Sequence, residues 1–185
     1  MINPFLPEQP VLIPDCKSFA DERGWFTTLP GVIFENVNYS TWIQQENVSV
    51  SKPGVLRGMH YQKHHPQAKL VKVLYGRVLD VVVDIRQWSP TFRKVSSFLL
   101  FDTGPMLYIP RGFAHGFYNL GEKDAVFHYK IDDEYHPEDE WGIRWDSIGF
   151  EWPIDGKLIL SEKDSKWPAL NDLFPNNVEE TNVQL

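Results

Sequence analysis

The chain has 185 residues and a formal net charge of −7 at pH 7, so it lacks the basic surplus of proteins that bind nucleic acid or anionic membranes. Its length predicts a single domain with a sizeable core, and its single cysteine, Cys16, excludes an intramolecular disulfide and a cysteine-based zinc site. No apolar run is long enough to span a membrane, and residues 1–4 do not begin a signal peptide. We therefore expect a cytoplasmic protein.

The first 17 residues predict an extended arm, punctuated by prolines around the apolar stretch 11–13. Arms of this kind often pair with a neighbouring subunit, so we expect a dimer contact here. A charged turn, residues 21–24, then precedes Trp25 and Phe26. It is either a solvated turn or an arginine and aromatic shelf against a ligand. Residues 29–40 are compatible with a short helix or a loop, and residues 176–185 predict a loose tail.

From residue 41 onward most of the chain predicts β-strand. Short alternating runs are separated by glycine and proline turns, a pattern typical of an antiparallel jelly roll or barrel. Two of these strands, 69–75 and 77–86, are expected to join tightly at Gly76. The full set of predicted strands is 42–51, 54–62, 69–75, 77–86, 95–101, 106–109, 113–117 and 125–131.

The predicted strand 77–86 carries acidic residues at positions where a strand facing a dry core would carry apolar ones. Asp80, Val82 and Asp84 share one face of the strand 77–86, because side chains alternate along a strand. Two aspartates beside a valine indicate a polar interior. This pattern favours a barrel that holds a ligand over a sandwich with a dry core.

A metal centre is the first candidate site. Residues 54–60 and 104–119 resemble the two signature motifs of the cupin superfamily, and the second motif matches well. In the first motif Gln62 stands where a second ligand histidine would be, and no glutamate follows at the expected interval. A mononuclear site needs three or four protein ligands. With only His60 and His115 in place, we predict no metal.

The second candidate is acid–base chemistry without a metal. A histidine paired with a carboxylate is a competent base, and a tyrosine on the opposite side of a substrate could return the proton. Removing a proton beside a ketone also requires groups that stabilise the enolate. Titratable residues in or next to the predicted strands and turns are His60, Lys69, Asp84, His115, Tyr129 and Asp164.

The third candidate is an anion pocket. Arg23, Arg57, Lys69 and Lys163 are spread through an acidic chain, and their spacing does not show whether they meet. If they do, a diphosphate is the natural ligand.

Several motifs together resemble the dTDP-4-dehydrorhamnose 3,5-epimerases. They run in the order seen in that family, over about residues 18 to 170. They include Asp21-Glu22-Arg23-Gly24-x-Phe26, Val55-Leu56-Arg57-Gly58-Met59-His60-Tyr61-Gln62, Ile109-Pro110-x-Gly112-Phe113-Ala114-His115-Gly116-Phe117 and Leu160-Ser161-Glu162-Lys163-Asp164.

The resemblance implies a metal-free, cofactor-independent homodimer that epimerises a nucleotide-linked 4-keto-6-deoxyhexose for dTDP-rhamnose and polysaccharide biosynthesis. Its implied fold is all-β, a cupin-type antiparallel jelly-roll barrel with a few short peripheral helices. By position, His60 matches the family's base, Asp164 the carboxylate paired with it, and Tyr129 the acid. Lys69 and His115 match the groups around the ketone oxygen. The positions implied to hold the nucleotide sugar are Arg23, Gln45, Asn47, Arg57, Lys69, His115, Glu140 and Lys163.

Two departures from the family leave alternatives open. Thr28 stands where the family usually carries a glutamate that contacts the nucleotide, and the loop between His60 and Lys69 is one residue shorter than usual. A 3-only or 5-only epimerase acting on a related nucleotide sugar is therefore an alternative to the 3,5-epimerase. A metal-dependent cupin enzyme and a non-catalytic sugar-binding cupin are alternatives of other classes. The presence of His60, Tyr129 and Asp164 together favours an enzyme, because binding alone requires neither base nor acid.

Overall fold

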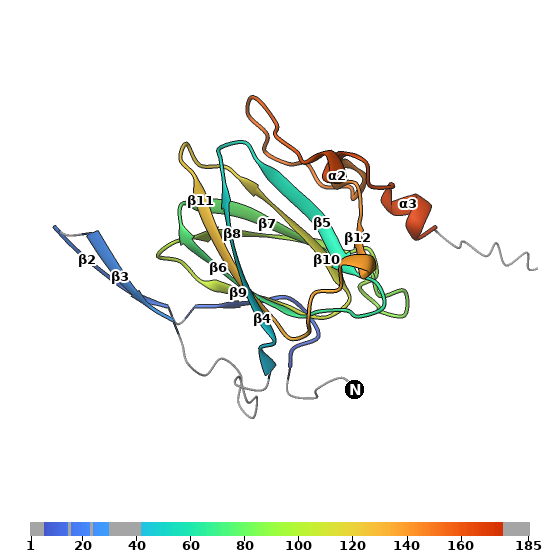
Figure 1. Cartoon of the computed structure of the whole chain (residues 1–185), viewed down its shortest axis with the longest axis horizontal. Coiled ribbons are helices and arrows are strands. Elements are labelled where there is room, and N and C mark those ends of the chain that lie inside the picture. Colours follow the sequence, from blue (N-terminus) through green and yellow to red (C-terminus); the bar gives the residue numbers. More distant parts are fainter. Residues whose placement is uncertain (1–5, 15, 23, 30–41, 176–185) are drawn as a thin grey trace, which may run out of the picture.

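Two five-stranded sheets face each other and form a barrel (Figure 1). The computed structural model describes residues 6–14, 16–22, 24–29 and 42–175. The first sheet has the order β1-β9-β6-β11-β4, with bounds Val11–Ile13, Met106–Ile109, Lys69–Tyr75, Ala125–Ile131 and Gln45–Ser51. The second has the order β12-β5-β10-β7-β8, with bounds Glu140–Gly142, Leu56–Gln62, Phe113–Asn119, Arg77–Asp84 and Val95–Phe101. Neighbouring strands pair antiparallel in both sheets, which confirms the predicted all-β jelly-roll barrel.

The remaining elements are small and peripheral. A hairpin of β2 (Lys17–Asp21) and β3 (Gly24–Thr28) projects from one side of the barrel, and α2 and α3 lie on the opposite side (Figure 1). The short helices are η1 (Pro137–Asp139), η2 (Trp145–Ser147), α2 (Glu162–Ser165) and α3 (Leu170–Leu173). Within the described ranges, no helix is long and apolar enough to cross a membrane.

The second sheet is covered on both faces around β7, where three valines follow one another. Val82 packs with Phe127 in the cluster between the two sheets. Val81 and Val83 point the other way and pack with Leu170 of the C-terminal segment. Burial of that segment against the sheet fixes the position of α2, which carries one of the predicted site residues.

The turn at Gly76 has a different role from the one predicted. The two strands form as expected, and Gly76 takes a φ of +82° that favours glycine. However, β6 and β7 belong to different sheets and do not pair with each other. Gly76 therefore carries the chain from one wall of the barrel to the other.

The predicted polar face of β7 holds only in part. Asp80 is buried inside the barrel, as expected. Asp84 lies at the end of β7, where its carboxylate accepts hydrogen bonds from Arg86, Ser89 and Thr91 at 2.6–2.8 Å. The strand ends at this network rather than at Arg86. Asp84 therefore holds a turn together and does not belong to a site inside the barrel.

Part of the N-terminal arm forms a strand in the first sheet of its own barrel. Val11–Ile13 forms β1 and pairs with β9 of the same chain, and Ile13 is buried. This stretch therefore completes a sheet of its own barrel. The expected helix or loop of residues 29–40 falls, from residue 30 onward, outside the described residues, as do the predicted tail 176–185 and the first five residues of the arm.

Candidate active site

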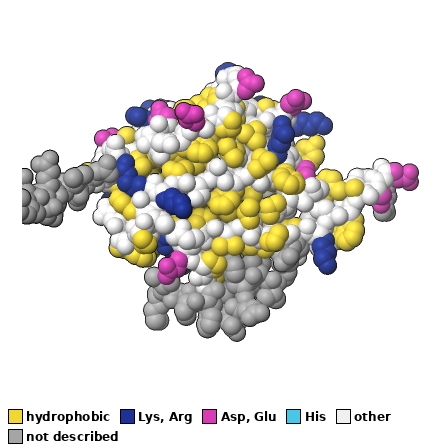
Figure 2. Space-filling view, turned by 180° about the vertical axis from the view of Figure 1, so that it is seen from behind, with side chains coloured by type: hydrophobic (Ala, Val, Ile, Leu, Met, Phe, Trp, Pro, Cys, Tyr) yellow, Lys and Arg dark blue, Asp and Glu magenta, His cyan; other side chains and the backbone are white. Residues whose placement is uncertain are grey.

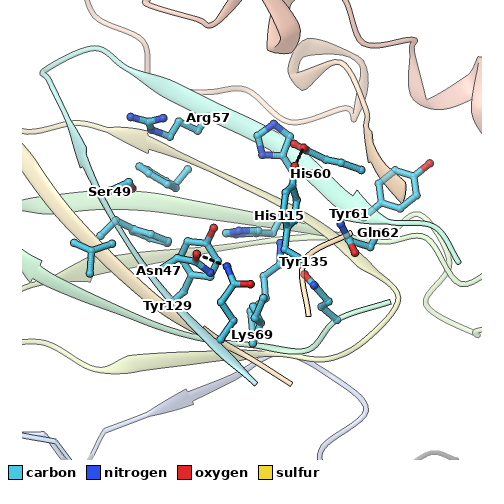
Figure 3. A pocket seen from close by; sticks show the side chains of 17 residues that line it. Asn47, Ser49, Arg57, His60, Tyr61, Gln62, Lys69, His115, Tyr129 and Tyr135 are labelled. Atoms are coloured by element: carbon cyan, nitrogen blue, oxygen red, sulfur yellow. Dashed lines mark hydrogen bonds between the residues drawn. The ribbon is translucent and has the colours of Figure 1, made fainter. Parts of the chain in front are cut away.

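A pocket of about 370 Å³ opens between the two sheets, and strands from both of them line it (Figure 3). Most of the residues predicted from the sequence meet at this pocket. Those in its lining are Gln45, Asn47, Arg57, His60, Lys69, His115, Tyr129 and Glu140.

A close approach of two strands brings two histidines together. A Cβ atom on Gly58 would lie 2.4 Å from the Cα atom of Gly116, so β5 and β10 could not pack this tightly with side chains at these positions. Gly58 also takes a φ of +122°, which side-chain-bearing residues rarely adopt. In the resulting register His60 on β5 is the pairing partner of His115 on β10.

His60 forms a hydrogen-bonded pair with Asp164 of α2. Its Nε2 lies 2.5 Å from Oδ1 of Asp164, although the two residues are 104 positions apart in the chain. Burial raises the pKa of Asp164, but the hydrogen bond from His60 and those from Ser161 and Trp167 outweigh it and lower the pKa overall. Asp164 is therefore ionised at neutral pH, as a carboxylate that orients a base must be.

His115 forms a second and more deeply buried pair with Asp80. Its Nδ1 lies 3.3 Å from Oδ1 of Asp80. Burial, together with the nearby charges of Lys69 and His60, holds the pKa of His115 well below its usual range. Burial also raises the pKa of Asp80 well above its usual range, although Lys69 opposes this shift. His115 is therefore neutral at pH 7.

Lys69 lies beside this pair at the bottom of the pocket. Burial lowers the pKa of its ammonium group to about 8, while the charges of Asp80 and Glu140 counteract part of the shift. At pH 7 most molecules keep the Lys69 proton. The bottom of the pocket therefore offers a cation and a neutral imidazole, which are suitable donors to an oxygen that gains negative charge.

Tyr129 lines the same pocket as His60, Lys69 and His115. It lies on β11, paired with Asn47 of β4. Figure 3 shows Arg57 and His60 on one side of the pocket and Asn47 and Tyr129 on the other. Burial and the charge of Glu140 raise the pKa of Tyr129, with Arg57 opposing. The phenol therefore keeps its proton at neutral pH and can donate it.

Charged groups gather at the rim of the pocket. Glu140 accepts hydrogen bonds from Lys163, at 2.6 Å, and from the hydroxyl group of Tyr135. Burial raises the pKa of Glu140, but these two hydrogen bonds outweigh it and lower the pKa overall. Arg57 donates to Ser51 and to the Val50 carbonyl oxygen, which aligns its guanidinium group along β4.

A set of buried polar side chains holds the loop that carries Tyr135. The amide of Gln62 donates to the His136 carbonyl oxygen at 2.8 Å and accepts from the His136 amide at 3.2 Å. Gln67 donates to the Glu134 carbonyl oxygen at 2.7 Å. The Asp139 carboxylate accepts from the backbone amides of the β5–β6 loop. These bonds place Tyr135 at the pocket.

Gln62 stands at the position where a metal-binding cupin would carry a second ligand histidine, and here it has a structural role. Its amide is occupied by the backbone of His136. Among the described residues, no group of three or more histidine, cysteine, aspartate or glutamate side chains is arranged to hold a metal ion.

Two predicted residues act through neighbours, and one lies outside the described part of the chain. Asp164 reaches the pocket through His60, and Lys163 reaches it through Glu140. Arg23 is outside the described residues. Sequence reasoning missed Ser49, Gln67 and Tyr135, all of which line the pocket. Tyr135 was not distinguishable from other residues of an acidic loop, and no spacing marks the two polar residues.

Comparison with known proteins identifies the family of the chain. The family model described as dTDP-4-dehydrorhamnose 3,5-epimerase matches residues 8–172. The chain belongs to the dTDP-4-dehydrorhamnose 3,5-epimerase family. The enzyme of that name from Methanothermobacter thermautotrophicus is 40% identical over 167 residues, which cover 87% of this chain and 90% of the relative. The family expected from the motifs is confirmed.

Solved structures of similar enzymes share the fold. One is the dTDP-6-deoxy-D-glucose-3,5-epimerase of Legionella pneumophila in complex with dTDP-4-keto-L-rhamnose. It has a TM-score of 0.73 and 37% identity, and the match covers 88% of this chain and 94% of that one. A 3'-monoepimerase from Streptomyces bikiniensis in complex with dTDP-quinovose also has a TM-score of 0.73, at 28% identity over 89% of this chain and 85% of that one. Sequence identity is thus higher to this 3,5-epimerase (37%) than to this 3'-monoepimerase (28%).

Proposed function

We propose that the protein epimerises dTDP-4-dehydro-6-deoxy-D-glucose at C3 and C5 and yields dTDP-4-dehydro-L-rhamnose. The observation that carries this proposal is the placement of a carboxylate-paired histidine and a protonated tyrosine on opposite sides of one pocket. Inversion at carbon requires this arrangement, because the proton must leave one face of the sugar ring and return to the other.

His60, oriented by Asp164, removes the proton from a carbon next to the C4 ketone. The electron pair of the broken C–H bond moves into the ring and places negative charge on the ketone oxygen. Lys69 and His115 donate to this enolate oxygen and stabilise it. Tyr129 then delivers a proton to the opposite face of the same carbon, and the ketone re-forms. His60 releases its proton to water and Tyr129 regains one from water, after which repetition at the second carbon completes the epimerisation.

The remaining predicted residues would hold the nucleotide sugar. Arg57 and Lys163 supply positive charge at the rim, suitable for a diphosphate. Gln45 and Asn47 on β4 and Glu140 on β12 offer polar atoms for hydroxyl groups, since all three line the pocket. We include Arg23 in this set because it falls in the family motif. No metal or organic cofactor has a step in this scheme.

The proposal includes a homodimer that works in the cytoplasm. The hairpin β2–β3 exposes Phe19, Trp25 and Phe26 at 61%, 43% and 64%, and an isolated two-stranded hairpin is marginally stable in water. Hydrophobic side chains also cover much of the face shown in Figure 2, from which this hairpin stands out. A second copy of the chain would cover such surfaces. Sedimentation equilibrium tests this: the dimer mass supports it, and a monomer at micromolar concentration contradicts it.

Incubation of the purified protein with dTDP-4-dehydro-6-deoxy-D-glucose, followed by NMR of the product, tests the reaction. We expect inversion at both C3 and C5, at a rate unchanged by a chelator. Inversion at one carbon identifies a single-site epimerase instead. Loss of activity on chelation, together with stoichiometric bound iron, manganese or zinc, would favour a metal-dependent cupin. Tight binding of dTDP without turnover would indicate a non-catalytic binding protein.

A further inference from the structure

Asp164, the partner of His60, shares its carboxylate with a second donor. The indole Nε1 of Trp167 lies 3.3 Å from Oδ1, the same oxygen atom that accepts from His60. Asp164 lies in α2, a single turn of helix, and its backbone amide donates to the Ser161 hydroxyl group at 3.0 Å. Besides His60, the indole and the Ser161 side chain therefore both hold the carboxylate group.

Trp167 is itself fixed against the strand next to His60. A Cβ atom on Gly142 would lie 2.3 Å from two atoms of the indole, Cε2 and Nε1, so the ring packs directly on the bare backbone of β12. Gly142 is the pairing partner of His60. The Arg144 amide donates to the Pro168 carbonyl oxygen at 2.8 Å, which ties the chain beside Trp167 to the residues after β12.

The Trp167 indole also contacts His60 and Lys163. The imidazole of His60 meets the indole edge-on, with ring centroids 6.4 Å apart. The ammonium group of Lys163 lies 5.5 Å from the centre of the indole ring. The direction of the Trp167 N–H bond is thus determined by the β12 backbone and the surrounding side chains.

We propose that Trp167 is a positioning residue, whose indole N–H holds Asp164 in place for His60 and withdraws part of the negative charge that the carboxylate presents to the imidazole. The inference rests on the proposed role of His60 as the base. A carboxylate oxygen that accepts two hydrogen bonds stabilises the imidazolium form of its partner less than one that accepts a single bond. Trp167 therefore weakens the attraction of the Asp164 carboxylate for a proton on His60.

Other charged groups near this pair come from each element packed around it. Glu140 on β12 and Lys163 on α2 pair with each other, and His115 on β10 is buried beside His60. Replacing Trp167 by phenylalanine removes the N–H donor, keeps an aromatic ring at this position and changes none of these three residues. It also removes the indole atoms that pack on Gly142, so the pH profile and not the activity alone carries the test.

The test compares kcat and KM across pH for wild type and Trp167→Phe. We expect plateau kcat to fall about 3- to 10-fold, the loss typical of one hydrogen bond, with KM within about 2-fold. We also expect the acid limb of the kcat profile to move up by roughly half a pH unit. The matched control is Trp141→Phe on β12, where the ring packs on Lys63 rather than at the His60 pair. Trp141→Phe should leave the acid limb of the kcat profile at the wild-type pH.

A purely structural role for Trp167 would lower the activity or stability without moving the acid limb. An active Trp167→Phe variant with an unchanged limb therefore overturns the inference and leaves the proposed function standing. Absence of epimerase activity in wild type overturns the proposed function instead. Should Trp167→Phe not fold, proton NMR of the wild-type indole N–H decides. A Trp167 resonance that shifts as the His60 pair titrates, and no longer does so in Asp164→Asn, supports the inference, and an invariant resonance contradicts it.

Discussion

Two histidine–aspartate pairs meet at the pocket through His60 and His115, which lie on neighbouring strands of one sheet, and the pairs differ in what surrounds them. The His60–Asp164 pair has side-chain exposures of 30% and 5% and a separation of 2.5 Å. The His115–Asp80 pair has exposures of 9% and 0% and a separation of 3.3 Å. In the first pair several donors hold the carboxylate ionised. In the second pair burial dominates, and Oδ2 of Asp80 has no hydrogen-bond partner among the described residues.

This difference shows that residue type alone does not define a catalytic pair. An ionised carboxylate makes its histidine a better base, whereas a buried pair that avoids charge leaves its histidine neutral and able to donate. In the proposed mechanism the same two residue types serve once in proton removal and once in stabilisation of the enolate. The predictions below test this division of roles.

The largest effect is expected at His60. His60→Asn removes the base while keeping a side chain of similar shape, so kcat should fall by about 10⁴-fold, the upper end for loss of a general base. Steady-state kinetics on dTDP-4-dehydro-6-deoxy-D-glucose measures this. Affinity for dTDP, determined by calorimetry, serves as the control and should stay within about 2-fold. A residual rate within tenfold of wild type would remove His60 from the role of base.

Lys69 should show the next largest effect. Lys69→Met removes the cation at the ketone oxygen, and kcat should fall by about 10²- to 10³-fold, as for loss of one donor to a developing oxyanion. The pH dependence has a defined sign. Since the Lys69 pKa is lowered to about 8, the ammonium loses its proton above that pH, and wild-type kcat should decline there. A profile measured from pH 6 to 10 should lose this alkaline limb in the variant. Persistence of the limb would contradict the role given to Lys69.

Asp164→Asn should have a smaller effect than loss of the base itself. The amide keeps the volume of the carboxylate but cannot stabilise the imidazolium that forms on His60, so we expect kcat to fall by about 10²-fold. Thermal unfolding of the variant provides the control for folding. Wild-type kcat in a folded variant would show that the pair makes no contribution to proton removal.

Asp80→Asn is the matched change in the buried pair and should have the smallest effect. Because burial favours the neutral form of Asp80, a neutral amide is a close substitute, and kcat should remain within about 3-fold. A carboxyl group with a raised pKa in the folded state contributes stability below its ordinary pKa, and this is lost as pH rises through the folded value. The melting temperature of Asp80→Asn relative to wild type should therefore increase from pH 4 to pH 8. A loss of activity as large as that of Asp164→Asn would mean that the two pairs are equivalent.

Much of the barrel was predictable because short runs rich in apolar residues are separated by glycine and proline turns. The strand 69–75 has the same bounds in the structure as in the prediction, since glycine and loop residues delimit it. The pairing was not predictable in the same way. Gly76 predicts a tight turn, but a turn does not say whether the strands it joins share a sheet.

The site was predictable only where the family resemblance supplied long-range information. His60 and Asp164 meet across 104 residues, a contact that no local spacing encodes. Tyr135 and Trp167 lie on connecting segments, and their positions depend on backbone contacts made elsewhere. The different charge states of the two histidine–aspartate pairs follow from burial, which the sequence does not report residue by residue.

In the proposed mechanism the more exposed pair, His60–Asp164, removes the proton and the more deeply buried pair, His115–Asp80, does not. Deuterium incorporation in deuterated water, measured by mass spectrometry and NMR, tests it most directly when wild type, His60→Asn and His115→Asn are compared. We predict deuterium at C3 and C5 with wild type, none with His60→Asn, and slower incorporation at the same carbons with His115→Asn. Incorporation by His60→Asn at the wild-type rate, or its complete loss in His115→Asn alone, would contradict the account.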